Sequence, residues 1–350
     1  FPHCFLQEKS VRGMVYPDRK IKRVSNGKRS EKDNHQENET KKGSTMKAVV
    51  TGGAGFIGAA TVKCLLEKGH EVWAVVRPDS PRLSNLWHQV PEELRPGLQV
   101  ISLDVRNLAQ EDFRKHGPLA DGWLHTSWGG PGSDNRKKRD MQQSNIQDSL
   151  AAVRAAAWIG CRRFVFTGSQ AEYGICYETM GEDTPCNPVS EYGKAKLEFA
   201  NQAEKLCRQL SMDYVHARLF SVYGPGDHPW TLIQSCLRTW QEGGEMELGE
   251  CSQWWNFLYI KDAAKGLAVL LEKGVHGIYN LAGRDTRILR EYVEEMYELC
   301  GSKGSFRYGI HPQQAEKNAN LIPDITKILA LGWKPTVSFK EGIYELLHCL

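Results

Sequence analysis

The feature that most restricts the fold of this 350-residue chain is a glycine-rich turn that directly follows a short apolar segment. The apolar segment, Lys47–Thr51, has the character of a buried strand, and residues 57–68 continue from the turn with a helical pattern. A strand, a glycine turn and a helix in this order form the first unit of folds in which strands and helices alternate. The turn therefore predicts where a parallel sheet begins.

The glycines of this turn are spaced as in dinucleotide-binding loops. Gly53, Gly55 and Gly58 match GxGxxG, while Gly52, Gly55 and Gly58 match GxxGxxG. Glycine permits a tight turn, close approach of the backbone to a pyrophosphate, and close packing of the helix on the strand. The free N–H groups at the helix start then favour phosphate binding. The alternative is an ordinary strand-to-helix turn, but its position after the first strand favours a dinucleotide site.

Short apolar segments alternate with helical patterns over the next part of the chain. We expect strands at residues 72–76, 100–103, 123–125, 164–167 and 214–219, with helices at 57–68, 108–115, 141–159 and 192–210. This alternation predicts an α/β fold, a doubly wound Rossmann-type parallel sheet with helices on both faces.

The alternation becomes less regular after residue 221. Here we expect strands at 257–260 and 278–281 and helices at 262–272 and 289–300. We therefore predict a dinucleotide-binding domain over residues 46–220 and a smaller, mixed α/β substrate-binding region over 221–350, interleaved with the first.

The first 45 residues differ from the rest in composition. They hold 11 Lys and Arg against 6 Asp and Glu, which leaves 34 against 36 for the remainder. Residues 20–42 are almost wholly polar, so they cannot bury enough surface to offset the entropy of ordering. We expect a disordered tail or a non-native extension, with Met46 as the natural start. A basic tail that binds nucleic acid is the alternative, and the mixed charge signs disfavour it.

The composition of the main body gives no reason to expect a nucleic-acid or membrane partner, because its charges nearly balance. No stretch approaches the roughly 18 apolar residues that span a bilayer. The 10 cysteines form no CxxC pair and no zinc-site spacing, so we expect reduced thiols, no metal and a cytoplasmic location.

The end of the second expected strand bears on the choice between NAD and NADP. An acidic side chain there binds the ribose hydroxyls, whereas arginine accommodates the 2′-phosphate of NADP. This chain has Arg77, with Arg82 nearby, and no acid at the strand end. We predict NADP as the cofactor, with NAD possible. Asp104, after the third strand, is expected to accept from the adenine amine or to cap a helix.

A second motif lies at the start of a long predicted helix. Tyr192 and Lys196 have the spacing YxxxK, which puts both on one face of the helix. An adjacent ammonium, with the positive charge of an oxidised nicotinamide, favours the phenolate and lowers the pKa of a tyrosine from about 10. Ser169 ends the expected strand before this helix, at the sheet edge where α/β folds bind ligands. A serine there can orient a substrate oxygen while Tyr192 moves the proton.

Taken in this order, the motifs resemble those of the extended short-chain dehydrogenase/reductase family, in its sugar-nucleotide epimerase/dehydratase branch. The resemblance extends from Met46 almost to the C-terminus. It rests on TGGAGFIG at 51–58, SQAEYG at 169–174, YGKAK at 192–196, RLFSVYGPG at 218–226 and NFLYIKD at 256–262.

The resemblance implies roles for particular residues. It implies Ser169, Tyr192 and Lys196 as the catalytic trio, and a supporting role for Asn145 from the helix before the fifth strand. The residues expected to bind cofactor are Gly52, Gly55, Phe56, Ile57, Gly58, Arg77, Asp104, Asn145, Tyr192, Lys196 and Phe220. It also implies a homodimer through paired helices.

Two departures from the family pattern bear on the reaction and the substrate. Dehydratases of the family carry acids directly after the Ser or Thr, whereas this chain has Gln170 and Ala171, so dehydration is not expected. Trp255 and Asn256 stand where members often have Arg and Asp, the arginine binding pyrophosphate. The tryptophans at 254 and 255 are then either packing residues or an aromatic wall against the substrate, with Arg284 or Arg287 supplying a phosphate contact.

The sequence thus predicts an NADPH-linked ketoreductase or NAD(P)-dependent epimerase of nucleotide-activated sugars. One alternative is an NADPH-dependent reductase of a non-nucleotide ketone. Another is a non-catalytic dinucleotide sensor, which the presence of both Tyr192 and Lys196 disfavours. His228 could supply a second acid for epimerisation or be an ordinary loop residue, and His125 is expected to be structural.

Overall fold

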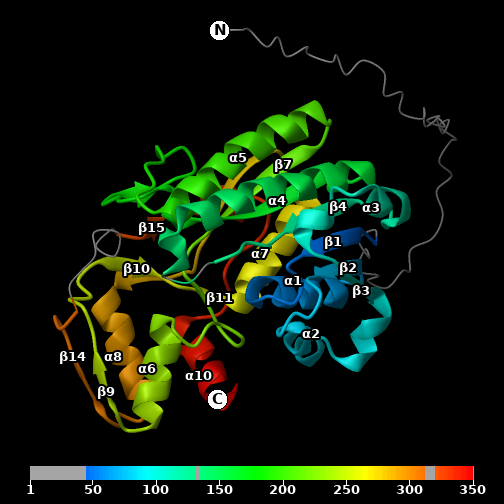
Figure 1. Ribbon diagram of the computed structural model, residues 1–350. Coiled ribbons are helices and arrows are strands. Elements are labelled where there is room, and N and C mark those ends of the chain that lie inside the picture. Colours follow the sequence, from blue (N-terminus) through cyan, green and yellow to red (C-terminus); the bar gives the residue numbers. More distant parts are fainter. Residues whose placement is uncertain (1–44, 131, 133, 312–319, 350) are drawn as a thin grey trace, which may run out of the picture. The chain divides into compact units, whose positions relative to one another are not determined.

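A computed structural model describes residues 45–350 of the chain, except 131, 133, 312–319 and 350 (Figure 1). By its contacts the chain divides into Phe1–Gly43 and Ser44–Leu350, and the described residues lie in the second part. The predicted tail of residues 1–45 lies outside the described residues, apart from its last residue.

The centre of the described part is a seven-stranded parallel sheet with the strand order β12-β7-β5-β4-β1-β2-β3. Its strands are β1 (Lys47–Thr51), β2 (Glu71–Val76), β3 (Leu98–Ser102), β4 (Gly122–His125), β5 (Arg163–Ser169), β7 (Asp213–Leu219) and β12 (Gly277–Leu281). Most of these strands are buried along almost their whole length, as expected for a parallel sheet covered on both faces. The strand order reverses between β1 and β4, the switch point at which α/β sheets bind ligands.

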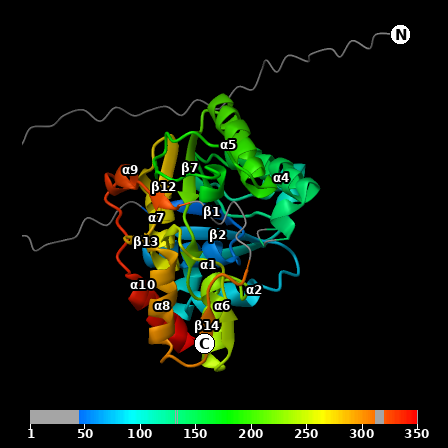
Figure 2. The same cartoon turned by 90° about the vertical axis from the view of Figure 1, so that its left-hand side faces the viewer.

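Helices cover both faces of this sheet (Figures 1 and 2). The main ones are α1 (Phe56–Glu67) and α7 (Ile260–Lys273), which pack on each other, and α4 (Arg139–Trp158) and α5 (Glu191–Gln209), which also form a pair. Neighbouring residues of β1 serve opposite faces: Val50 packs with the leucines of α1 and α7, and Val49 packs with Phe199 of α5. The predicted doubly wound α/β fold is confirmed.

Shorter helices connect the strands of the first part. They are α2 (Leu83–Gln89) after β2 and α3 (Glu111–His116) after β3, with 3-10 turns η1 (Glu92–Gly97), η2 (Val105–Asn107), η3 (Asn135–Lys137) and η4 (Gln170–Glu172). The sequence did not predict α2, because its seven residues show no clear apolar periodicity.

The C-terminal part contains a further apolar cluster around Trp240, Tyr292 and Phe339. Its helices are α6 (Leu232–Gln241), α8 (Leu289–Leu299), α9 (Thr326–Leu329) and α10 (Phe339–Cys349). Its two-residue and three-residue strands are β8 (Val222–Tyr223), β9 (Glu245–Glu247), β10 (Trp254–Asn256), β11 (Leu258–Tyr259), β13 (Thr286–Ile288), β14 (Ser305–Arg307) and β15 (Ile322–Pro323). The last of these pairs with β6 (Thr179–Met180) from the first part of the chain. The described helices include none long and apolar enough to cross a membrane.

Two elements from this later part of the chain belong to the core built around the central sheet. β12 pairs with β7 at the sheet edge, and α7 packs against α1. The two expected regions are therefore linked through the sheet itself. The division at residue 220 stays a prediction.

Candidate active site

The turn from β1 to α1 has the geometry that its glycines predicted. Gly52 adopts a φ of +73°, and a Cβ there would lie 2.9 Å from the backbone nitrogen of Ser127. A Cβ on Gly58 would lie 2.1 Å from the carbonyl oxygen of Gly52, so the helix and the turn approach too closely for any side chain. A Cβ on Gly53 would lie 2.8 Å from the Cβ of Ala74, so both glycine spacings have a steric reason in this turn.

The N-terminus of α1 is suited to a phosphate. Gly55 caps the helix without a side-chain hydrogen bond, and the first turn contains no acid. The N–H groups of that turn and the helix dipole therefore stay available for an anion. These residues fit the pyrophosphate of a nicotinamide dinucleotide. Phe56 itself is buried in the apolar cluster of the C-terminal part, while Ile57 is half-buried.

The residues expected near the adenosine end of the cofactor lie on the loops after β2 and β3. Arg77 is exposed. Asp104 caps η2, and its carboxylate also accepts from the guanidinium of Arg106 at 2.9–3.0 Å. The hydrogen bond from Arg106 lowers the pKa of Asp104. The structure therefore shows the capping role, and a contact with adenine stays a prediction.

Arg82, also expected near the cofactor, reaches a loop from the later part of the chain. Its Nη2 donates to Nδ1 of His228 at 2.7 Å, and the His228 ring stacks on Trp230 with centroids 4.2 Å apart. Burial and the charge of Arg82 both lower the pKa of His228. His228 is therefore engaged as an acceptor, which does not support its role as a second acid.

The three expected catalytic residues come together at the carboxyl end of β5. Ser169 is the last residue of β5, and its Oγ accepts from the backbone N–H of Ala171 at 3.2 Å. The cap of α5 at Ser190 places Tyr192 and Lys196 on the first two turns of this helix. Lys196 donates from Nζ to the carbonyl oxygen of Thr167 at 2.7 Å.

The protonation properties of this trio differ from the expectation. Burial raises the pKa of Tyr192, and Arg136 and a hydrogen bond with Ser169 oppose that rise. Burial lowers the pKa of Lys196 to about 7. Lys196 was expected to lower the pKa of the tyrosine, but the cation that acts on Tyr192 here is Arg136. No sequence pattern pointed to Arg136, because it belongs to a run of cations before a helix and matches no motif.

Asn145 and Phe220, which were expected to bind the cofactor, are each held by neighbouring protein groups. The side-chain amide of Asn145 accepts from the N–H of Gly129 at 2.8 Å and donates to its carbonyl at 3.0 Å, so it fixes the loop after β4. Trp128 of this loop lies edge-on to Tyr192 with centroids 6.4 Å apart. Phe220 is fully buried and packs near Tyr173. Their contacts with cofactor stay predictions.

A cavity of about 800 Å³ lies next to the trio: the neighbours Gln170 and Glu191 line it, whereas Ser169, Tyr192 and Lys196 themselves do not. Its wall includes Arg136, Gln170, Ala171, Ser221, Trp230 and Trp255. Neither Arg284 nor Arg287 lines it, and Arg287 is paired with Asp285 and Glu295. Trp255 thus forms part of an aromatic wall, whereas the predicted phosphate contact from either arginine has no support.

Glu172, the residue that follows Ala171, lies in a buried polar cluster and does not line the cavity. Its carboxylate contacts Nε2 of His216 at 2.9 Å and Nε of Arg218 at 3.0 Å. Burial alone would raise the pKa of Glu172, but these two neighbours bring it down to about 2. A carboxylate held ionised in this way does not supply a proton to a substrate.

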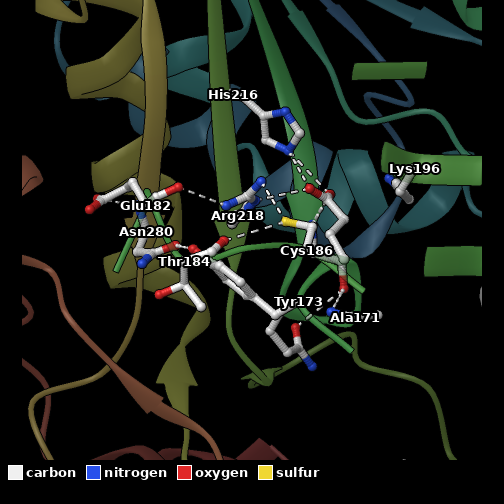
Figure 3. A network of polar contacts seen from close by, with 12 residues as sticks. Ala171, Tyr173, Glu182, Thr184, Cys186, Lys196, His216, Arg218 and Asn280 are labelled. Carbon is white, nitrogen blue, oxygen red and sulfur yellow. Dashed lines mark hydrogen bonds and ion pairs between the residues drawn. The ribbon is translucent and has the colours of Figure 1, made fainter. Parts of the chain in front are cut away.

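Arg218 extends the cluster to Glu182 and Cys186, as Figure 3 shows. Its Nη1 donates to the carbonyl of Glu182 at 3.2 Å, and its Nη2 lies 3.1 Å from Sγ of Cys186. His125, expected to be structural, is fully buried elsewhere in the core, between the side chains of Thr51 and Ser149. Within the described residues, no group of three or more His, Cys, Asp or Glu could hold a metal.

A glycine turn at the sheet's switch point, with a serine at the end of β5 and a tyrosine and a lysine at the start of α5, is the arrangement of the extended short-chain dehydrogenase/reductase class. The family described as "NAD dependent epimerase/dehydratase family" matches residues 48–282. The chain belongs to this family.

Curated relatives cover most of the chain. An uncharacterized UDP-glucose epimerase of Bacillus subtilis is 27% identical over 315 residues, covering 85% of this chain and 96% of the relative. A UDP-glucose 4-epimerase of Corynebacterium glutamicum is 26% identical over 321 residues, covering 86% of this chain and 94% of that protein.

Solved structures share the fold. The UDP-glucose 4-epimerase of Thermotoga maritima with UDP-glucose has a TM-score of 0.76 at 22% identity, covering 87% of this chain and 98% of that one. The UDP-glucose 4-epimerase of Thermus thermophilus in complex with NAD has a TM-score of 0.75 at 23% identity, with the same coverage of 87% and 98%. At this identity the likeness concerns the fold alone.

Proposed function

We propose that the protein is an NAD(P)-dependent ketoreductase or epimerase that acts by hydride transfer on a nucleotide-activated sugar. The observation that carries this proposal is the meeting of Ser169, Tyr192 and Lys196 at the end of β5. The two positions that follow Ser169, Gln170 and Ala171, line the neighbouring cavity and hold no acid. Relatives whose names specify UDP-sugars support a nucleotide-sugar substrate.

A nicotinamide dinucleotide, when bound here, would supply or accept the hydride. Gly52, Gly55 and the first turn of α1 would hold its pyrophosphate. Tyr192 gives a proton to the substrate oxygen in reduction and takes it in oxidation. Ser169 would orient that oxygen, and Lys196 would bind the ribose of the nicotinamide. Because no acid follows Ser169 directly, elimination of water from the sugar is not part of the proposal.

Tyr192→Phe tests this assignment, since it removes one oxygen and leaves the ring in place. We expect turnover to fall by at least about a thousandfold, because the proton donor is lost. Binding of the nucleotide cofactor, measured by fluorescence titration, should change little. Turnover within tenfold of the parent enzyme would contradict the assignment.

The exposed Arg77 supports NADP(H) over NAD and hence a reductase with a dissociable cofactor. Mass spectrometry of nucleotides released on denaturation tests this preference. An empty site or NADP favours a reductase, to be tried with keto-sugar nucleotides and NADPH. Stoichiometric NAD would instead favour an epimerase that recycles its own hydride, and would overturn the interpretation of Arg77.

A reductase of a non-nucleotide ketone is the second candidate. Trp255 stands where family members often have the arginine that binds pyrophosphate, and it offers no positive charge for a phosphate. Asn256 beside it is fully buried and bonded to Gly283 and Thr286. Activity with simple ketones but with no keto-sugar nucleotide would favour this candidate. A cytoplasmic location and a homodimer through α4 and α5 also stay predictions.

A further inference from the structure

Arg136 is the cation closest to the ring of Tyr192. It belongs to η3, directly before α4, and its Cζ lies 4.3 Å from the centroid of the Tyr192 ring. Nζ of Lys196 lies farther away, at 5.6 Å from the same centroid. Guanidinium groups favour such a position over an aromatic ring, where they contact its negative face.

Lys196 is held by other partners. Its Nζ donates to the carbonyl of Thr167 and lies 4.3 Å and 4.5 Å from the ring centroids of Trp128 and Phe166. With burial lowering its pKa to about 7, an appreciable part of Lys196 is neutral near neutral pH. An arginine stays charged throughout this range.

The remaining groups around Tyr192 do not supply a competing positive charge. Ser169 of β5 is a neutral hydrogen-bond partner, Trp128 presents its edge, and Glu172 of η4 raises the pKa of Tyr192. Arg136 itself forms no side-chain ion pair or hydrogen bond with the part of the chain that the structure describes. Its charge is therefore not neutralised by a neighbouring carboxylate there, although Arg136 is half-buried in the cavity wall.

We propose that Arg136 is a positioning residue that stabilises the ionised form of Tyr192 during the reaction, a role usually expected of the lysine in the YxxxK motif alone. This inference rests on the proposed function, in which Tyr192 exchanges the proton. In reduction, the O–H bond of Tyr192 breaks as the substrate oxygen takes the proton, and the phenolate that remains lies beside the Arg136 charge. In oxidation the same phenolate takes the proton back.

The ionisation of Tyr192 can be measured without substrate or cofactor. The measurement uses NMR of protein labelled with carbon-13 at the ring Cζ of tyrosine. The signal that is missing in Tyr192→Phe belongs to Tyr192, and its chemical shift against pH gives the midpoint of ionisation. We expect Arg136→Gln to move the midpoint upward by about one pH unit or more, because a cation within about 4–6 Å is removed. Arg136→Lys should recover part of that shift, since it keeps the charge. Arg139→Gln, an exposed arginine at the start of α4 outside the cavity wall, is the matched control and should leave the midpoint and the turnover unchanged.

Steady-state kinetics provide the second measurement. In the direction in which Tyr192 acts as the base, kcat/KM falls as acid protonates this residue. In Arg136→Gln, the pH of this fall should rise by the same amount as the ionisation midpoint of Tyr192. An unmoved midpoint in Arg136→Gln, with Tyr192→Phe inactive, would overturn the role of Arg136 and leave the proposed function intact. An active Tyr192→Phe enzyme would overturn both. An equal upward shift in Arg139→Gln would show a general charge effect and would also overturn the inference.

Discussion

At the level of single residues, Glu172 connects the end of β5 to the buried groups beneath it. Its carboxylate accepts from the backbone N–H of Ser169 at 2.8 Å, which forms a capping box around η4. The same carboxylate is paired with His216 and Arg218, both almost fully buried. Glu172 therefore helps to fix the backbone at Ser169, although it does not itself line the cavity.

Replacing Glu172 with Gln should lower the free energy of unfolding at neutral pH by about 3–5 kcal/mol, because it leaves a buried arginine without its counter-charge. Urea unfolding measures this loss. The double variant Glu172→Gln/Arg218→Met, which removes both charges, should recover part of the stability. A loss below about 1 kcal/mol in the single variant would show that the cluster contributes little.

The same carboxylate predicts a dependence of stability on pH. Its pKa falls from 4.5 to about 2 on folding, so its contribution is complete above pH 4.5 and is lost as the pH falls towards 2. A difference of this size corresponds to about 3 kcal/mol. We expect unfolding free energies of the parent protein to drop more steeply over this range than those of Glu172→Gln. Parallel slopes in the two proteins would contradict this assignment of the pKa.

At the level of elements, the β1–α1 turn is a segment for which sequence and structure agree closely. Apolar runs and glycine spacing suffice there because the constraint is local: a tight turn needs a positive φ and an approach that no Cβ permits. The run of cations before α4 has no such local constraint. Arg136 contacts Tyr192 only because η3 and α5 pack together, and this packing leaves no pattern in the sequence.

The same distinction explains what else the sequence missed. The expected strands and long helices were found to within a few residues, whereas α2, α6 and α10 were not predicted. Arg287 could be proposed for phosphate binding because the sequence does not show where its side chain turns; its partners, Asp285 and Glu295, emerge only once β13 and α8 are placed. The polar cluster of Glu172 likewise joins elements far apart in the chain. The roles assigned to the site residues themselves stay predictions.

Gly58→Ala tests the turn as an element. The new Cβ would meet the carbonyl of Gly52, so the turn or the helix must shift. We expect binding of the nicotinamide dinucleotide to weaken at least about tenfold, since the N–H groups that hold the pyrophosphate are displaced. Fluorescence titration with the reduced cofactor measures it. Gly249→Ala, where the added Cβ would lie 3.5 Å from its nearest neighbour at an ordinary φ, should bind as the parent does. Equal affinity in both variants would argue against this turn as the cofactor site.

At the level of the whole molecule, the sheet cannot be completed from the first part of the chain alone. β12 supplies its edge beside β7, and α7 covers the face on which α1 lies. Leu267 and Leu270 of α7 are fully buried in the same cluster as Val50 of β1. Ending the chain at residue 220 would therefore expose the side chains that these later elements cover, and it would leave β7 as an unprotected edge.

We accordingly expect a fragment of residues 46–220 to be unfolded or aggregated, and a fragment of residues 46–350 to unfold in a single cooperative transition. The reason is that α7 and β12 share one continuous apolar cluster with β1 and α1. If either region unfolds, the other loses part of its core. Circular dichroism and intrinsic fluorescence during urea unfolding measure this, and coincident curves are the expected result. A stable, monomeric 46–220 fragment with a cooperative transition of its own would show that α7 and β12 merely add to an independent domain. It would also allow the cofactor site to be studied apart from the substrate-binding region.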